Sequence, residues 1–265
     1  MSRIIAAAAA LVLTGAAAGS LAEPPDCGVA AVGADVGLDR QRWVESEGAR
    51  RLVREVGTLP RVSVEVLWGC QRTEVALAAQ LRDGSRSYVG VTSLGRAVES
   101  SSQVRETAVA LKVWPAGGQW GVRLTYVADR REIQSVGAAQ GYPEEHRAVI
   151  AALGYRHVGA RSVAGWQWRA EAWLGGNGGS RVRVDLPQAE PAKLQTGRAV
   201  QLDGRIRFMP GGERDGGMYA ELSAMRRETG AGQHHALHQD GRLVGSARQP
   251  RTKTSVIALV VGHAW

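Results

Sequence analysis

The chain contains very little lysine, phenylalanine or cysteine. Its 33 basic residues are almost all arginine, with lysine only at Lys112, Lys193 and Lys253, and one phenylalanine contrasts with eight tryptophans. The two cysteines, Cys27 and Cys70, lack a partner at CxxC spacing, which argues against a redox motif or a thiolate metal centre. The formal net charge is +8, yet the arginines alternate with apolar residues instead of forming a basic stripe, so we expect no nucleic-acid partner.

Long hydrophobic runs are also missing beyond the N-terminus, so no segment reaches the roughly 20 apolar residues of a transmembrane helix. Residues 1–22 have the pattern of a signal peptide: a basic start at Arg3, an Ala-rich apolar run, and a small-x-small site ending at Ala22. The sequence therefore predicts an exported protein. In an oxidising compartment Cys27 and Cys70 are a disulfide candidate, and two unpaired thiols are the alternative.

The strongest positive signal is apolar alternation with a period of two, which is typical of strands. Residues 107–113 and 120–126 alternate on either side of Pro115–Gly118 and predict an antiparallel hairpin. Asp83-Gly84 predicts another turn. Each alternating segment has one apolar face and one charged face, and we find no internal repeat of 20 to 50 residues.

The last eleven residues, Ser255–Trp265, alternate in the same way and end on an aromatic residue. This segment resembles the closing strand of bacterial outer-membrane β-barrel proteins, whose assembly signal is a C-terminal Phe or Trp preceded by apolar residues at every second position. His263 departs from the preferred Tyr or apolar residue. The resemblance implies a Gram-negative outer-membrane location, contact with outer-membrane lipid and with the barrel-assembly machinery, and an assembly signal at Ile257, Leu259, Val261 and Trp265. We expect no cofactor.

The expected fold is all-β: an antiparallel closed β-barrel of roughly 8–12 strands over residues 61–265, with one or two short helices. Residues 23–60 are expected to form an N-terminal periplasmic segment with a possible helix at Asp39–Val56. A second helix is predicted at Pro143–Gly154, which has Pro at its start, acids in its first turn and Gly at its end. The alternative is a soluble periplasmic α+β protein with an antiparallel sheet, in which the charged face is solvated.

In a barrel the charged faces would point into the lumen, where buried charges must be paired. The predicted lumen charge network consists of Arg123, Arg169, Glu171, Arg183, Asp185, Arg205, Arg207 and Glu221. An outer-membrane protein of this kind would be structural, a narrow porin-like pore, or a secretion or export component, and an Arg-rich lumen favours anions if water enters. The alternatives are a soluble periplasmic binding or assembly protein and a barrel enzyme that modifies lipid or cell-wall material.

Catalytic signals are weak, and no catalytic residue is predicted. His234, His235 and His238 form a weak metal candidate, because imidazole is a common ligand but no nearby Asp, Glu or Cys completes a set. Their flanking glycines favour a surface histidine cluster instead. The chain is therefore expected to act without enzymatic activity.

Overall fold

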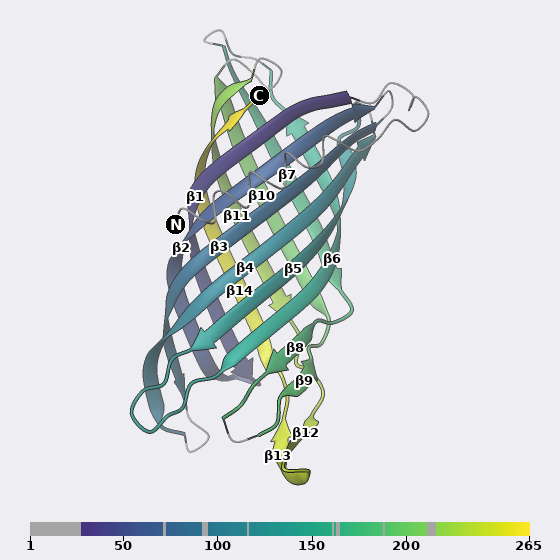
Figure 1. The fold of residues 1–265 in the computed structure, drawn as a ribbon. Coiled ribbons are helices and arrows are strands. Elements are labelled where there is room, and N and C mark those ends of the chain that lie inside the picture. The colour runs from purple at the N-terminus through teal and green to yellow at the C-terminus, as the bar shows by residue number, and fades with distance from the viewer. Residues whose placement is uncertain are drawn as a thin grey trace, which may run out of the picture.

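The computed structural model describes residues 28–70, 73–91, 95–115, 117–160, 162, 165–187, 189–210 and 216–265. In these ranges the chain is all-β and its sheet closes into a ten-stranded antiparallel barrel, which confirms the expected fold class (Figure 1). The described residues contain no helix long and apolar enough to cross a membrane. The barrel strands are β1 (Gly28–Glu47), β2 (Arg50–Cys70), β3 (Thr73–Val91), β4 (Ala97–Pro115), β5 (Trp120–Ile133), β6 (Pro143–Val158), β7 (Trp166–Asn177), β10 (Ala199–Pro210), β11 (Gly217–Thr229) and β14 (Arg251–Ala264).

Barrel closure depends on the pairing of the first strand with the last. β14 pairs with β1 from Gly33↔Ala264 to Ser46↔Arg251, and it pairs with β11 on its other side. Every barrel strand therefore has two neighbours, and the remaining strands form small additions at one end. Those additions are β8 (Arg181–Val184) and β9 (Ala192–Gln195), which extend β6, and the hairpin of β12 (His235–Gln239) and β13 (Arg242–Ala247).

Both predicted helices are wrong. Asp39–Val56 forms the second half of β1 and the start of β2, and Pro143–Gly154 lies in β6. The apolar residues that mimic helical spacing are divided between the two faces: Trp43 and Val53 point inward, whereas Val44 lies on the outer face. Within the described residues the barrel wall starts at Gly28, and residues 28–60 form part of this wall.

The turn predicted at Asp83-Gly84 is also wrong, because β3 runs through both residues. They lie opposite Pro60, which has no N–H to donate, and the paired register between β2 and β3 is interrupted between Val56↔Ser87 and Arg61↔Arg82. A Cβ on Gly84 would lie 3.0 Å from the buried side chain of Leu59. Gly84 thus lies where the hydrogen-bonded pairing of β2 with β3 is interrupted, and the chain does not reverse its direction there. The hairpin at Pro115–Gly118 is confirmed by the pairing of β4 with β5.

The two ends of the barrel differ in the length of the segments that connect the strands. At the end that carries Trp265, the strands are joined by the segments 71–72, 116–119, 159–165 and 211–216; we call this the terminal end. At the opposite end, the loop end, the connections include the longer segments 134–142, 178–198 and 230–250, which contain β8, β9, β12 and β13 (Figure 1). The hairpin predicted from the sequence around Pro115 belongs to the terminal end.

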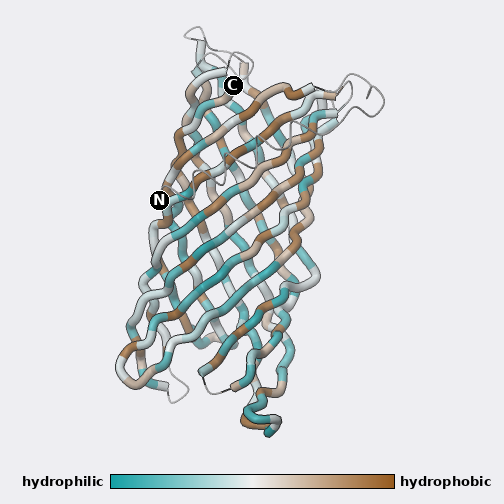
Figure 2. The backbone as a smooth tube through the Cα atoms, in the orientation of Figure 1, coloured by the Kyte–Doolittle hydropathy of each residue, from teal (hydrophilic) through white to brown (hydrophobic). Residues whose placement is uncertain are grey.

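The outer surface of the terminal half carries many exposed apolar side chains. In Figure 2 brown segments are more frequent in this half, and teal and white segments are more frequent in the loop-end half. Outward Trp120, Tyr155, Trp166, Trp168 and Trp265 border this surface at the terminal end. Bands of apolar and aromatic side chains in this order are typical of barrels that contact lipid. We define the apolar belt by its large exposed aliphatic and Phe residues: Val36, Leu38, Val109, Leu111, Val122, Leu124, Val149, Leu153, Leu174, Val200, Leu202, Ile206, Phe208, Leu222, Ile257, Leu259 and Val261.

Two tryptophans fill the lumen at the level of the belt. Trp114 and Trp173 are 0% and 2% exposed, and their ring centroids are 4.8 Å apart. Each ring covers a glycine of a neighbouring strand, since a Cβ built on Gly121 or Gly154 would lie 2.3 Å from the Trp114 or Trp173 ring. The glycines let the rings lie flat against the wall, so the inside of the barrel is packed here.

Replacing Gly121 with Ala should destabilise the barrel by about 1–3 kcal/mol, because the added methyl forces Trp114 off its position in a packed interior. Urea unfolding of the folded protein in lipid vesicles, followed by tryptophan fluorescence, measures the change. Gly69→Ala is the matched control, because its Cβ would have its nearest neighbour at 3.8 Å. Equal unfolding midpoints for the two variants would contradict the packing described here.

Candidate functional site

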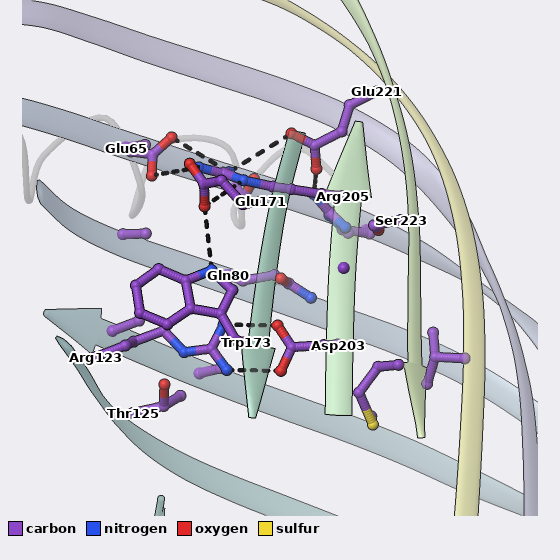
Figure 3. A pocket seen from close by; sticks show the side chains of 18 of the residues that line it. Glu65, Gln80, Arg123, Thr125, Glu171, Trp173, Asp203, Arg205, Glu221 and Ser223 are labelled. Carbon is purple, nitrogen blue, oxygen red and sulfur yellow. Dashed lines mark hydrogen bonds and ion pairs between the residues drawn. The ribbon is translucent and has the colours of Figure 1, made fainter. Parts of the chain in front are cut away.

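The main cluster of polar side chains inside the barrel is centred on Arg205 of β10. Its Nη2 lies 2.7 Å from Oε1 of Glu171, and its Nε donates to Oε2 of the same carboxylate at 3.0 Å. The guanidinium also contacts Glu65 of β2 at 3.4 Å and Glu221 of β11 at 3.5 Å. Figure 3 shows these three carboxylates converging on Arg205 from different parts of the wall. The arginine therefore ties together strands on opposite sides of the lumen.

Three further cations belong to this central network. Lys112 of β4 donates to Glu65 at 2.6 Å, and Arg207 of β10 donates to Glu221 at 2.9 Å. Arg123 of β5 makes two parallel hydrogen bonds to Asp203 of β10, at 2.7 and 2.6 Å, and lies over the Trp173 ring. Such fork-like pairs are the strongest and most directional ion pairs. Since β5 and β10 are not neighbours in the sheet, this pair braces the barrel across its interior.

A second buried cluster lies towards the loop end and is centred on Arg131 of β5. Its guanidinium donates to Glu45 at 2.8 Å, to Glu55 at 3.0 Å and to Glu144, and lies 5.1 Å from the Trp43 ring. Glu55 also accepts hydrogen bonds from Arg86 and from Ser102. We call this group the loop-end cluster. Arg131 and Glu55 are 1% and 0% exposed, so the cluster closes the lumen at this level.

The loop 134–142 contributes one polar group beside the loop-end cluster. Burial and the carboxylates of Glu144 and Glu45 raise the pKa of the Tyr142 hydroxyl well above its usual value, so the phenol stays protonated at neutral pH. Tyr142 also packs against the small apolar cluster formed by β8 and β9. This contact attaches the added strands to the barrel wall.

Beside the central network lies an internal cavity of about 200 Å³. Small side chains such as Ala108 and Ala110 form part of its wall, and the central network borders it (Figure 3). Its lining carries seven cationic and six anionic side chains, so the cavity is nearly neutral despite the basic composition of the chain. A volume of this size holds about seven waters, each of which occupies about 30 Å³ in the liquid.

The structure brings six of the eight predicted network residues together inside the barrel: Arg123, Arg169, Glu171, Arg205, Arg207 and Glu221. Arg169 contacts Glu171 at 2.9 Å and Glu74 at 3.5 Å. Arg183 and Asp185 do not join them, because they lie at β8 outside the closed sheet and their side chains are 54% and 39% exposed. The alternation that predicted a lumen face for these two residues arises in a short added strand with one solvated face.

Sequence reasoning missed most of the charged residues that β1 to β5 contribute. These strands supply Asp35, Asp39, Glu45, Glu55, Arg61, Glu65, Arg82, Arg86, Glu106, Lys112 and Arg131. Several of them lie within residues 23–60, where the sequence predicts a separate periplasmic segment. The available signal was the run Asp35, Asp39, Gln41, Trp43 and Glu45, in which every position is odd-numbered, as an inward strand face requires.

The remaining candidate residues lie apart from the lumen. Ile257, Leu259, Val261 and Trp265 face outward from the closing strand. His235 and His238 lie on β12 and His234 directly before it, at the loop end, and the described residues contain no group of three or more His, Cys, Asp or Glu that could hold a metal ion. Cys70 ends β2, whereas Cys27 lies outside the described residues, so the disulfide between them stays a prediction.

Replacing Arg205 with Met should destabilise the protein by about 3–5 kcal/mol, because it leaves Glu171 without its main partner in a buried site. The double variant Arg205→Met with Glu171→Met should lose less than this single variant, since it removes both charges of the pair. Equilibrium unfolding in lipid vesicles measures the free energy of unfolding of both variants. Arg183→Met is the control, and loss of its exposed pair should change stability by about 0–1 kcal/mol. A similar loss for Arg183→Met and Arg205→Met would contradict the assignment of Arg205 to a buried network.

No protein-family model matches this chain, and comparison with curated proteins found no match. Among solved structures, it is similar to the outer membrane protease OmpT from Escherichia coli, with a TM-score of 0.51 and 10% sequence identity over 93% of this chain and 98% of that chain. It also matches the β domain of the Bordetella autotransporter BrkA, with a TM-score of 0.45 and 12% identity over 89% of this chain and 100% of that one. The similarity to OmpT concerns the fold alone: the chain is a closed antiparallel barrel of the type found in bacterial outer-membrane proteins.

Proposed function

We propose that this protein is a structural outer-membrane barrel whose lumen is closed at rest, and that it holds its loop end outside the cell. The observation that carries the proposal is the filled interior: Trp114, Trp173, Arg131 and Glu55 have almost no exposed surface. A porin has a water-filled lumen, whereas a small barrel fills its interior with side chains. Of the three roles expected from the sequence, a structural one fits this interior better than a narrow pore or a secretion conduit.

The apolar belt supports placement in a bilayer. Its outward side chains come from eight of the ten barrel strands, all except β2 and β3, and an apolar surface of this extent is unfavourable in water. Beyond the belt the outward positions become charged, for example Arg40, Arg54 and Arg130. The loop-end half of the wall therefore extends out of the membrane into water.

The connections support one orientation in that bilayer. In bacterial outer-membrane barrels the periplasmic turns are short and the extracellular loops are longer. By this rule the terminal end, with Trp265, faces the periplasm and the loop end faces outward. The hairpins β8–β9 and β12–β13 then lie on the cell surface, and β8 is joined to the barrel wall by its pairing with β6.

The closed lumen makes a direct electrical prediction. Purified wild-type protein, reconstituted into a planar bilayer, should produce no steady ohmic conductance, because ion-paired side chains and two indole rings obstruct the path. An open porin, reconstituted in parallel, is the positive control for insertion. Stable wild-type current steps that scale with salt concentration would overturn the structural role in favour of the narrow pore.

The closing strand makes a second prediction, which concerns assembly. Trp265 extends the pairing of β14 with β1, since its N–H donates to Val32 O at 2.8 Å and its carbonyl accepts from Val32 N at 3.1 Å. Deleting Trp265 should remove the protein from the outer-membrane fraction, because the assembly machinery loses its terminal aromatic signal. Trp265→Phe, which keeps an aromatic terminus, should restore it. Normal membrane recovery of the deletion variant, with heat-modifiable migration in gels, would contradict this reading of the signal.

A further inference from the structure

An open groove of about 590 Å³ runs along the outer wall between β10 and β11, where the apolar belt meets the charged loop-end half. Its apolar part comes from Val200 and Leu202 of β10, which are 60% and 58% exposed. Its charged part comes from Arg198, directly before β10, and from Arg226 and Arg251 of β11 and β14. The groove thus combines an apolar floor with a basic end.

A single carboxylate organises the basic end. Glu228 accepts from Arg226 at 2.7 Å and from Arg251 at 2.8 Å, and Nζ of Lys253 lies 3.5 Å from it. Strand alternation places all four residues on the outer face, and Arg198 adds another exposed cation. Three cations therefore contact one anion, which orients the guanidinium groups, and with Arg198 the basic end keeps a positive excess.

The register of the sheet extends this basic surface at the edge of the belt. Leu202 pairs with Arg226, Arg226 with Ser255, and Ser255 with Arg42 of β1. The row changes from an aliphatic side chain to guanidinium groups across neighbouring strands. A ligand that fits it must itself be apolar at one end and anionic at the other.

We propose that this groove binds a phosphate-bearing lipid of the outward-facing leaflet, with its acyl chain on Val200 and Leu202 and its phosphate between Arg226 and Arg251. Arginine pairs offer the planar, two-pronged donors that match phosphate oxygens. Basic residues directly beyond a membrane-embedded surface attract anionic headgroups. The inference rests on the bilayer placement proposed above, and a freely dissolved anion would leave the apolar floor unused.

The test uses the full-length protein, folded in a neutral detergent, with short-chain phosphatidic acid as the probe and phosphatidylcholine of equal chain length as the comparison. Native mass spectrometry measures the bound fraction of each lipid. Wild type should retain phosphatidic acid at lower concentration than phosphatidylcholine, and the variant Arg226→Gln with Arg251→Gln should weaken binding of phosphatidic acid by about tenfold or more, since two charge-assisted contacts are lost.

Arg105→Gln is the matched control. Arg105 is as exposed as Arg226 and pairs with one carboxylate, Asp83, but lies on β4 away from the groove. It should bind phosphatidic acid like wild type, and an equal loss in this control would show that general surface charge, not the groove, holds the lipid. Leu202→Gln should weaken binding of phosphatidic acid, because it makes the apolar floor of the groove polar. An unchanged affinity would overturn the proposed place of the acyl chain.

A competition experiment with inorganic phosphate on the wild-type protein distinguishes a lipid site from a simple anion site. Inorganic phosphate should fail to displace phosphatidic acid from wild type at equal concentration, and efficient displacement would overturn the lipid assignment. Heat-modifiable migration in gels is recorded for every sample. A folded, detergent-dependent protein that does not distinguish the two lipids refutes the groove alone, whereas a wild-type chain that is soluble without detergent refutes the bilayer placement as well.

Discussion

Closure of the sheet between β1 and β14 is the constraint on which the rest of the molecule depends. Where the outer surface contacts lipid, backbone N–H and C=O groups have no water to bond and must be paired within the sheet. The pairing from Gly33↔Ala264 to Ser46↔Arg251 removes the last two open edges. Because closure also fixes which face of each strand points outward, it determines the apolar belt and the charged interior together.

A closed barrel of ten strands encloses a narrow space, and the chain fills that space with paired charges and aromatic rings. Arg205, Arg123 and Arg131 each pair with a carboxylate on a strand that is not their neighbour in the sheet. Buried pairs of this kind hold a specific arrangement, because breaking one leaves an uncompensated charge. The same side chains that brace the barrel wall also obstruct passage through the lumen.

The sequence predicts the closed antiparallel barrel because period-two alternation and the aromatic C-terminus are local features, visible in Ile257, Leu259 and Trp265 themselves. It predicts helices wrongly at Asp39–Val56 and Pro143–Gly154, because an inward face that contains both Trp43 and Glu45 does not alternate simply in hydrophobicity. It includes Arg183 and Asp185 wrongly, since nothing in four alternating residues distinguishes a wall strand from an added one. Which charges meet, such as Arg123 with Asp203, depends on barrel geometry across 80 residues of sequence.

The account is tested most directly by the environment of each side chain along the closing strand. Spin labels placed singly at residues 255–263 of the protein in lipid vesicles report collisions with oxygen, which concentrates in lipid, and with a water-soluble nickel complex. We expect oxygen accessibility to alternate with a period of two, with maxima at Ile257, Leu259 and Val261, while Val256, Ala258 and Val260 exclude both reagents. Uniform accessibility to the nickel complex along the strand would contradict a closed barrel with lipid outside and packed side chains within.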